Sequence, residues 1–338
     1  MRVNIFSKYL FYSVGGAEKS MQQYLNKNYD INDEVVLYGA INIKNFNSDK
    51  YKHNFPDYYK LVNVLFPFLL SRFPYVEYCL NRNSIKSYFS KIESSEELLT
   101  YGIYAPLAII GYKGKSVFFL RSETDLCINN NYHIGFKKVL NSIYKLIESP
   151  FFSFYKKDIY KAVQISNVIC NSKWMQDQLL KRFEKISKIE YPEINLVELK
   201  EGFKLLPKEK RGVVFIGDNI FKGSHLLPKI ANLLPSITFF IFDRRMNKLK
   251  INKNMHYMAW ESDPKKVYQY ADLVIVPSIW LEAFGRVSIE AQALNIPVLV
   301  SNRGGLPETI DHDSKYIIDD YKNPVEWAKR IENILAHD

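Results

Sequence analysis

Short runs that are apolar at nearly every position recur along the second half of this 338-residue chain, with helical patterns between them. The clearest are GVVFIG (212–217), ITFFIF (237–242), DLVIVPS (272–278) and IPVLVS (296–301). A strand that is apolar on both sides belongs in a sheet that helices cover on both faces. Strands that alternate with helices at this spacing predict βαβ units around a parallel sheet.

The first half of the chain shows the same alternation less regularly. Its strand patterns occur at 3–6, 34–39, 97–102, 116–121 and 167–172. A charged connector that contains proline and glycine, LVELKEGFKLLPKEKRG (196–212), is typical of an interdomain linker. We therefore predict an α/β protein of two doubly wound, Rossmann-like domains, residues 1–195 and 196–338.

Net charge, cysteine content and the length of apolar runs limit which partners the protein can have and where in the cell it can work. The 46 Lys and Arg residues outnumber the 36 acidic ones, and this net charge of +10 favours anionic partners such as nucleotides or acidic lipids. The three cysteines include no CxxC pair, which indicates free thiols in a reducing compartment. The first residues lack the pattern of a signal peptide, and the longest apolar run, 61–70, is too short to span a bilayer. We expect a cytoplasmic protein without a transmembrane helix.

In doubly wound domains, ligands bind at the carboxyl ends of the strands. Glycines and charged residues gather at four such ends, at 6–16, 217–223, 277–286 and 301–308. The third leads into EAFGRVSIEA (282–291), which places Glu282 in a strand-to-helix loop and Glu290 about one turn into the helix.

This stretch has the groups that a nucleotide sugar requires. Gly285 lets the backbone approach a ligand closely, and the free N–H groups at a helix start suit an anion. A carboxylate can accept hydrogen bonds from both hydroxyls of a diol, which sugars and riboses present. The alternative is that Glu282 and Glu290 only complement the helix dipole.

The stretch also resembles the family-four retaining glycosyltransferases of the GT-B fold. The resemblance rests on the two glutamates within SIWLEAFGRVSIEAQALNIPVLVSNRGGLPETI (278–310), on FIGDNIFKG (215–223), on Gly15-Gly16 and on NSKWMQDQL (171–179). It covers nearly all of the second half, whereas residues 40–95 look unrelated. The resemblance implies two domains that face each other across a cleft, the first for the acceptor and the second for the nucleotide-sugar donor. It also implies a last helix that packs back toward the first domain.

Transferred residue by residue, the resemblance implies that Glu282 binds hydroxyls of the donor sugar, Glu290 the ribose, and Lys222 the diphosphate. It implies further donor contacts at Gly15, Gly16, Gly217, Ala283, Phe284 and Gly285. To these we add Arg286 as a phosphate or sugar contact, and we group Glu282, Lys222 and Arg286 as catalytic residues. Relatives often carry arginine where this chain has Asp218. Binding of the diphosphate would therefore depend more on Lys222 and Arg286.

The end of another strand, SVFFLRSETDLC (116–127), offers candidates for the acceptor side. They are Arg121, Glu123 and Asp125, with a solvated loop as the alternative. The aromatic and basic stretch 58–91 could lie on an anionic membrane surface, and the alternative is that it forms the core of the first domain.

No metal and no cofactor is expected. Asp311-His312-Asp313 has the composition of a turn, and the histidines form no ligand-spaced pair. GGAEKS matches neither a P-loop nor a dinucleotide fingerprint.

These observations predict a retaining, hexosyltransferase-type glycosyltransferase. It would move a sugar from a nucleoside-diphosphate sugar to a hydroxyl of a glycan or lipid-linked acceptor, in the biosynthesis of cell-surface polysaccharide or lipopolysaccharide. It would work in the cytoplasm, peripherally on the inner face of the cell membrane. The alternatives are a sugar-nucleotide epimerase or phosphorylase on the same scaffold, or a basic nucleic-acid-binding protein. No nucleic-acid-binding motif appears, so no nucleic-acid partner is expected.

Overall fold

A computed structural model of the chain divides into two compact units. Unit 1 comprises residues 1–131 and 135–193, and unit 2 comprises 132–134 and 194–338. The division at 193/194 lies two residues before the domain boundary expected from the sequence. The structure describes residues 2–8, 10, 16–41, 56, 58–66, 70, 72–94, 96–217 and 219–336. Among the described helices, none is both long and apolar enough to cross a membrane.

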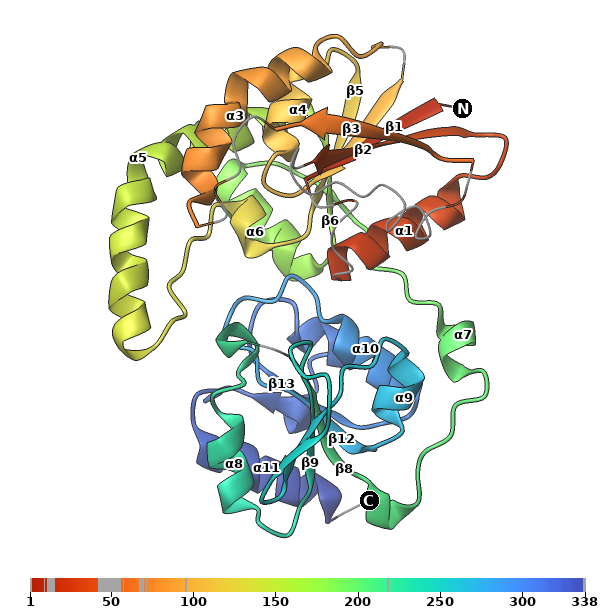
Figure 1. Ribbon diagram of the computed structural model, residues 1–338, viewed down its shortest axis with the longest axis vertical. Coiled ribbons are helices and arrows are strands. Elements are labelled where there is room, and N and C mark those ends of the chain that lie inside the picture. Colours follow the sequence, from red (N-terminus) through yellow and green to blue (C-terminus); the bar gives the residue numbers. More distant parts are fainter. Residues whose placement is uncertain are drawn as a thin grey trace. The chain divides into compact units, whose positions relative to one another are not determined.

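Unit 1 is a doubly wound sheet (Figure 1). Its strand order is β3-β2-β1-β4-β5-β6-β7, and each pair of neighbouring strands is parallel. Its strands are β1 (Arg2–Ser7), β2 (Glu34–Ile41), β3 (Lys60–Leu65), β4 (Glu97–Tyr101), β5 (Lys115–Leu120), β6 (Asn167–Cys170) and β7 (Lys188–Ile189). Its helices are α1 (Gly16–Asn28), α3 (Pro74–Phe89), α4 (Ala105–Gly111), η1 (Glu123–Leu126), α5 (Gly135–Ile165) and α6 (Lys173–Phe183). Helix α1 covers one face of the sheet, and α3, α4 and α5 pack together on the other.

The aromatic stretch 58–91 contributes β3 and α3 to this unit. Seven of its described apolar side chains are buried, among them Tyr59, Phe66, Tyr78 and Phe89, and three are exposed, namely Tyr58, Leu70 and Leu80. This burial corresponds to the alternative in which the stretch forms the core of the first domain. Few of its described apolar side chains are left for a membrane surface.

Unit 2 has the strand order β10-β11-β9-β8-β12-β13-β14, with an antiparallel pair only between β10 and β11 among the described strands. These strands are β8 (Gly212–Ile216), β9 (Phe239–Phe242), β10 (Lys250–Asn252), β11 (Met255–Met258), β12 (Ala271–Val276), β13 (Val298–Ser301) and β14 (Ile317–Ile318). One face is covered by α8 (Leu227–Leu233) and α11 (Pro324–Leu335), which contact each other. The other face carries α7 (Leu196–Lys200), α9 (Pro264–Tyr268) and α10 (Arg286–Ala293).

One expectation about unit 2 needs correction, and one of its helical segments is divided. The predicted linker 196–212 begins as helix α7, because Leu199 is buried in the core of this unit. The helical segment between β8 and β9 is divided into a short 3₁₀ helix, η3 (Ile220–Lys222), and α8. Gly223 separates them, with a φ of 85°, and such a left-handed residue ends a helix.

Candidate functional site

The loop after β8 brings Lys222 to the carboxyl end of the unit 2 sheet. Asn219 caps η3, because its side-chain oxygen accepts from the amides of Phe221 (3.0 Å) and Lys222 (3.2 Å). Gly223 lies so close to the end of β12 that a Cβ there would stand 2.0 Å from the carbonyl oxygen of Pro277. The amide of Ile279 then donates to the carbonyl of Phe221 at 2.9 Å. These contacts tie the Lys222 loop to the loop that carries Glu282.

Glu282 and Lys222, both predicted donor-site residues, form an ion pair. Lys222 Nζ lies 2.5 Å from Glu282 Oε1, and Ser278 Oγ donates to the same oxygen at 2.7 Å. The Glu282 side chain is 9% exposed and that of Lys222 is 33% exposed. The Lys222 ammonium also lies 4.8 Å from the ring centroid of Trp280, a cation–π distance. Within the described residues both hydrogen bonds to the Glu282 carboxylate use Oε1.

The backbone of Glu282 contacts Gly304 and Gly305 in the loop after β13. The Gly305 amide donates to the Glu282 carbonyl at 2.7 Å. Gly304 has a φ of 63°, and a Cβ on it would stand 2.1 Å from the same carbonyl oxygen. Only glycine therefore fits at position 304 without a shift of the main chain of Glu282.

Glu290, predicted to bind the ribose, lies on the first turns of α10. Its Oε2 accepts from the buried Tyr268 hydroxyl at 2.9 Å, and Arg286 Nη2 lies 3.4 Å from its Oε1. Burial, and then the Glu290 carboxylate, raise the pKa of Tyr268 well above its usual value. Tyr268 is therefore a neutral donor at physiological pH. Its hydrogen bond fixes the orientation of the Glu290 carboxylate.

The other predicted donor contacts lie around these two carboxylates or in unit 1. Gly285 is the N-cap of α10, with a φ of 147° and no side chain to cap the helix. Ala283 and Phe284 before it are buried, and Gly217 follows β8, where a Cβ would stand 2.7 Å from the Phe215 ring and 3.0 Å from the Lys222 Cβ. Gly16 is the exposed first residue of α1 in unit 1. Gly15 and Asp218 lie outside the described residues.

The three acceptor-side candidates lie in one turn of unit 1, where they also have structural contacts. Asp125 Oδ2 accepts from the amides of Arg121 and Ser122, both at 2.9 Å, and so caps η1. Burial raises the pKa of the Asp125 carboxyl. The Arg121 guanidinium donates to the carbonyl of Ala17 at 2.9 Å, and Glu123 is 8% exposed. Their part in acceptor binding stays a prediction.

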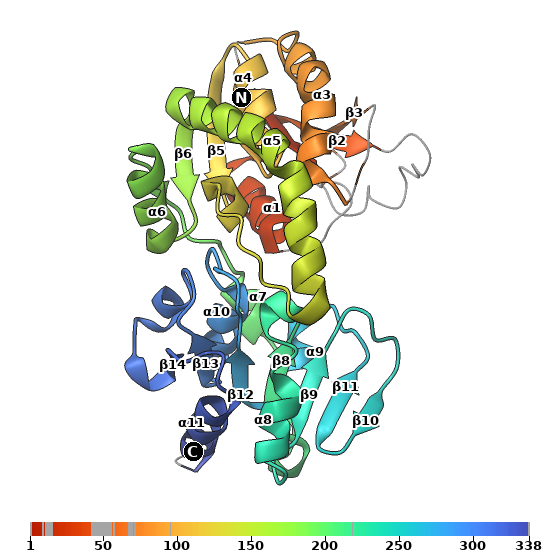
Figure 2. The same cartoon turned by 90° about the vertical axis from the view of Figure 1, so that its left-hand side faces the viewer.

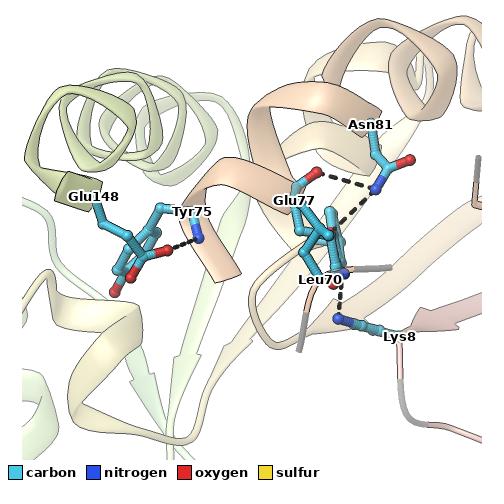
Figure 3. Close-up of polar contacts among 7 residues, drawn as sticks. Lys8, Leu70, Tyr75, Glu77, Asn81 and Glu148 are labelled. Atoms are coloured by element: carbon cyan, nitrogen blue, oxygen red, sulfur yellow. Dashed lines mark hydrogen bonds and ion pairs between the residues drawn. The ribbon is translucent and has the colours of Figure 1, made fainter. Parts of the chain in front are cut away.

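A polar cluster in unit 1 was not among the predicted site residues (Figure 3). Lys8, directly after β1, forms an ion pair with Glu77 of α3, which is 1% exposed. The hydroxyl of Tyr104, in the connection after β4, donates to the same Glu77 oxygen at 2.6 Å. Strands β1 and β4 are neighbours from which the chain proceeds in opposite directions, and ligands of doubly wound sheets bind at such a switch point.

Part of this cluster could have been found from sequence. Lys8 follows a strand directly, and a charged residue at that place is a candidate for a ligand contact. Glu77 lies in a helix with mixed apolar and polar residues, and only packing shows that its carboxylate is buried.

The expected turn at Asp311-His312-Asp313 is present. Asp311 ends η4 (Pro307–Ile310) with a φ of 51°, and His312 has a φ of 57°. Asp313 caps η5 (Ser314–Tyr316) by accepting from the amide of Lys315 at 2.9 Å. Both aspartates thus have structural roles in a turn.

Comparison with known proteins shows which family the second unit resembles. Residues 198–338 match the family described as glycosyl transferases group 1. Spore coat protein SA of Bacillus subtilis is 33% identical over 150 residues, which are 38% of this chain and 40% of that protein. The chain spans less than half the length of the curated relatives it matches first.

Solved structures extend the likeness to the whole fold. Anabaena HepE, solved in complex with UDP and glucose, superposes with a TM-score of 0.63 at 14% identity and covers 98% of this chain and 89% of its own. WaaG, described as a glycosyltransferase involved in lipopolysaccharide biosynthesis, gives 0.62 at 15% identity over 99% of this chain and 90% of its own. Residues 198–338 therefore match the group 1 glycosyltransferase family, and the fold of the chain is similar to that of solved GT-B glycosyltransferases.

Proposed function

We propose that the chain transfers a sugar from a nucleoside-diphosphate sugar to an acceptor hydroxyl, with retention at the anomeric carbon. The observation that carries the proposal is the pair of held carboxylates in unit 2. Glu282 is fixed through Oε1 by Lys222 and Ser278, and Glu290 is fixed by Tyr268. Carboxylates held in this way suit two sets of diol hydroxyls, one on the sugar and one on the ribose. The glycosyltransferase family match and the UDP complexes of HepE support this use.

In the proposed reaction, charge develops on the leaving diphosphate while the sugar becomes oxocarbenium-like. Lys222 and the amides at the start of α10 would stabilise the diphosphate, because they are fixed before the reaction starts. Arg286, held at 3.4 Å from Glu290, would add a second positive charge. The leaving phosphate would take the acceptor proton, so the step requires neither a metal ion nor a covalent protein intermediate. A transfer rate unaffected by EDTA is the expected result.

The acceptor would be a glycan or a lipid-linked sugar of a cell-surface polysaccharide or lipopolysaccharide. We assign it to unit 1, at the carboxyl ends of β1 and β4. Lys8 and Tyr104 lie there, together with the nearby candidates Arg121, Glu123 and Asp125. We further propose that the reaction takes place at the cytoplasmic face of the cell membrane.

Thermal shift with UDP, GDP, ADP, CMP and their common sugar conjugates tests the donor site. One nucleotide is expected to stabilise the wild type and Glu209→Ala, an exposed control in the same unit, but not Glu290→Ala. Urea unfolding without ligand shows whether Glu290→Ala is folded. A folded Glu290→Ala that responds like the wild type would refute the ribose role.

Once the donor is known, NMR of the first product formed tests retention. The anomeric configuration of the new bond is expected to match that of the donor. An inverted product would refute the proposed mechanism but not the binding site.

A further inference from the structure

The side chain of Trp280 lies against the Lys222 ammonium, whose Nζ is 4.8 Å from the centroid of the tryptophan ring. The neighbouring Ile279 is buried in the core of unit 2, whereas Trp280 is only half-buried. Aromatic rings attract cations at this distance, and the tryptophan ring attracts them most strongly. Trp280 therefore adds a third group to the ion pair between Lys222 and Glu282.

The segment that carries Trp280 is bonded directly to the segment that carries Lys222. Strand β12, which precedes Trp280, lies beside β8, which precedes Lys222 (Figure 2). The amides of Ile279 and Trp280 both donate to the carbonyl of Phe221, at 2.9 and 3.3 Å. Phe221 directly precedes Lys222 in the chain. The ring and the ammonium therefore belong to two main-chain segments that are fixed relative to each other.

Two further hydrogen bonds hold the Trp280 segment from the end of β13. Ser301 Oγ donates to the carbonyl of Ser278 at 2.7 Å. Arg303 Nε donates to the carbonyl of Ile279 at 3.1 Å. A group carried by a rigid segment is placed more precisely than one on a mobile loop. The Trp280 ring can therefore set the position of a more mobile side chain.

Lys222 is the mobile side chain that such a ring can support. Its side chain is 33% exposed, and a lysine that a ligand immobilises loses rotamer freedom. Glu282 Oε1 holds one side of the ammonium at 2.5 Å, and the Trp280 ring lies on another. An ammonium has three N–H groups, so a phosphate oxygen can be bound while both contacts persist. The ring thus lowers the entropy that phosphate binding must remove.

We propose that Trp280 is a positioning residue whose ring holds the Lys222 ammonium where the donor diphosphate binds. The inference rests on the proposed function, in which Lys222 stabilises the diphosphate and Glu282 binds the sugar. Because Lys222 pairs with Glu282, the phosphate that it meets is the one that bears the sugar. Trp280 acts through Lys222, so its removal is expected to weaken binding of a nucleoside diphosphate but not of the monophosphate.

Titration calorimetry of the full chain with UDP, GDP and ADP, and with the three monophosphates, tests this role. Trp280→Leu keeps an apolar side chain without the ring, and we expect it to bind the preferred diphosphate about threefold to tenfold more weakly. Trp280→Phe keeps a weaker ring, and its affinity is expected to lie between those of the wild type and Trp280→Leu. The monophosphate of the same base is expected to bind all three proteins alike.

Tyr316→Leu is the matched control. Lys315 Nζ lies 5.2 Å from the centroid of the Tyr316 ring, which is also half-buried in unit 2. This pair directly precedes β14, which is parallel to β13, so it lies at the amino ends of the strands and away from the site. Tyr316→Leu is expected to bind the diphosphate like the wild type. Urea unfolding without ligand shows whether each variant is folded.

Fluorinated tryptophans separate the charge distribution of the ring from its packing. Fluorine withdraws electron density from the ring face and hardly changes the size of the ring. The affinity for the diphosphate is therefore expected to fall further with each added fluorine. The label enters all four tryptophans of the chain, and in Trp280→Phe this decline is expected to disappear.

NMR of protein labelled with carbon-13 at the lysine Cε reports the contact without any ligand. The Lys222 signal is identified by its loss in Lys222→Arg. Its methylene protons are expected to be shifted upfield, because they lie near the face of an aromatic ring. Trp280→Leu is expected to abolish this shift.

Four results would overturn the proposal. They are equal diphosphate affinities of the wild type and Trp280→Leu, an equal loss for the diphosphate and the monophosphate, fluorination without effect, and a Lys222 signal that is not shifted in the wild type. A wild type that binds none of the nucleotides would overturn the proposed function together with this role. A wild type that binds a diphosphate no better than Trp280→Leu would overturn this role alone.

Discussion

Gly304 and Gly202 provide a matched pair of substitutions that tests how Glu282 is seated. Both belong to unit 2, and both have left-handed backbones, with φ of 63° and 67°. An added Cβ at Gly202 would meet nothing within 4 Å. At Gly304 it would stand 2.1 Å from the Glu282 carbonyl oxygen and 2.8 Å from its amide nitrogen. Alanine at the two positions therefore has similar backbone strain and differs in its collision with Glu282.

The expected magnitudes follow from these contacts. Left-handed backbone costs an alanine roughly 1–2 kcal/mol at either position. At Gly304, overpacking adds about 1–3 kcal/mol, and loss of the hydrogen bond from Gly305 to Glu282 adds about 1 kcal/mol. We therefore expect the free energy of unfolding to fall by about 1–2 kcal/mol in Gly202→Ala and by about 3–6 kcal/mol in Gly304→Ala.

Urea denaturation measures both losses, and titration with the nucleotide sugar then measures the site. Gly304→Ala is expected to bind the donor more weakly, because Glu282 must move away from the new methyl group. Gly202→Ala is expected to bind it like the wild type. Equal losses of stability together with equal donor affinities would refute the role of Gly304 in seating Glu282.

Three further predictions concern single side chains. Glu282→Gln is expected to weaken nucleotide-sugar binding about tenfold. Its affinity for the bare nucleoside diphosphate is expected to stay the same or to rise, because the substitution releases Lys222 from its ion pair. Calorimetry with both ligands measures the two affinities, and equal losses for both would argue against a sugar contact. Tyr268→Phe is expected to lower the free energy of unfolding by about 1.5–3 kcal/mol, because the hydrogen bond from the buried hydroxyl to the Glu290 carboxylate is lost. Donor binding is expected to weaken as well, because Glu290 is no longer held in place. An unchanged urea midpoint would contradict this prediction. Burial raises the pKa of Tyr38 to about 12, so its stabilising contribution is present below the unfolded pKa of about 10 and is lost as pH rises from there through 12. Tyr38→Phe is expected to show a shallower alkaline loss of stability than the wild type in urea titrations, and parallel curves would exclude this contribution.

Most strands of unit 2 could be predicted from the sequence, because the pattern that specifies each strand lies within a few consecutive residues. Runs such as VVFI and LVIV are apolar on both faces, and they became β8 and β12 at the centre of a sheet. The pairing of Lys222 with Glu282 was not readable in the same way. It depends on Gly223 lying against Pro277, a contact between segments far apart in the chain.

In unit 1, the burial of several side chains could not be predicted from the sequence. Strand β3 and helix α3 lie in a stretch whose aromatic and basic residues suited either a core or a membrane surface. Their burial is decided by residues from later segments, such as Tyr104, which stacks on Tyr78, and Tyr155, which contacts the Tyr78 ring edge to face. The apolar residues in the first half of α5 have a helical period in the sequence, but only the structure shows that Phe136 and Leu146 are each 75% exposed.

By itself, the sequence determined the succession of strands and helices, the two-domain organisation and the glutamates at one strand end, because apolar periodicity and glycine act over a few residues. Only the tertiary structure decided which charged groups pair, which aromatic stretch is core and which helix face stays exposed. Those outcomes depend on the desolvation of side chains by residues distant in the chain, and a linear pattern does not contain that information.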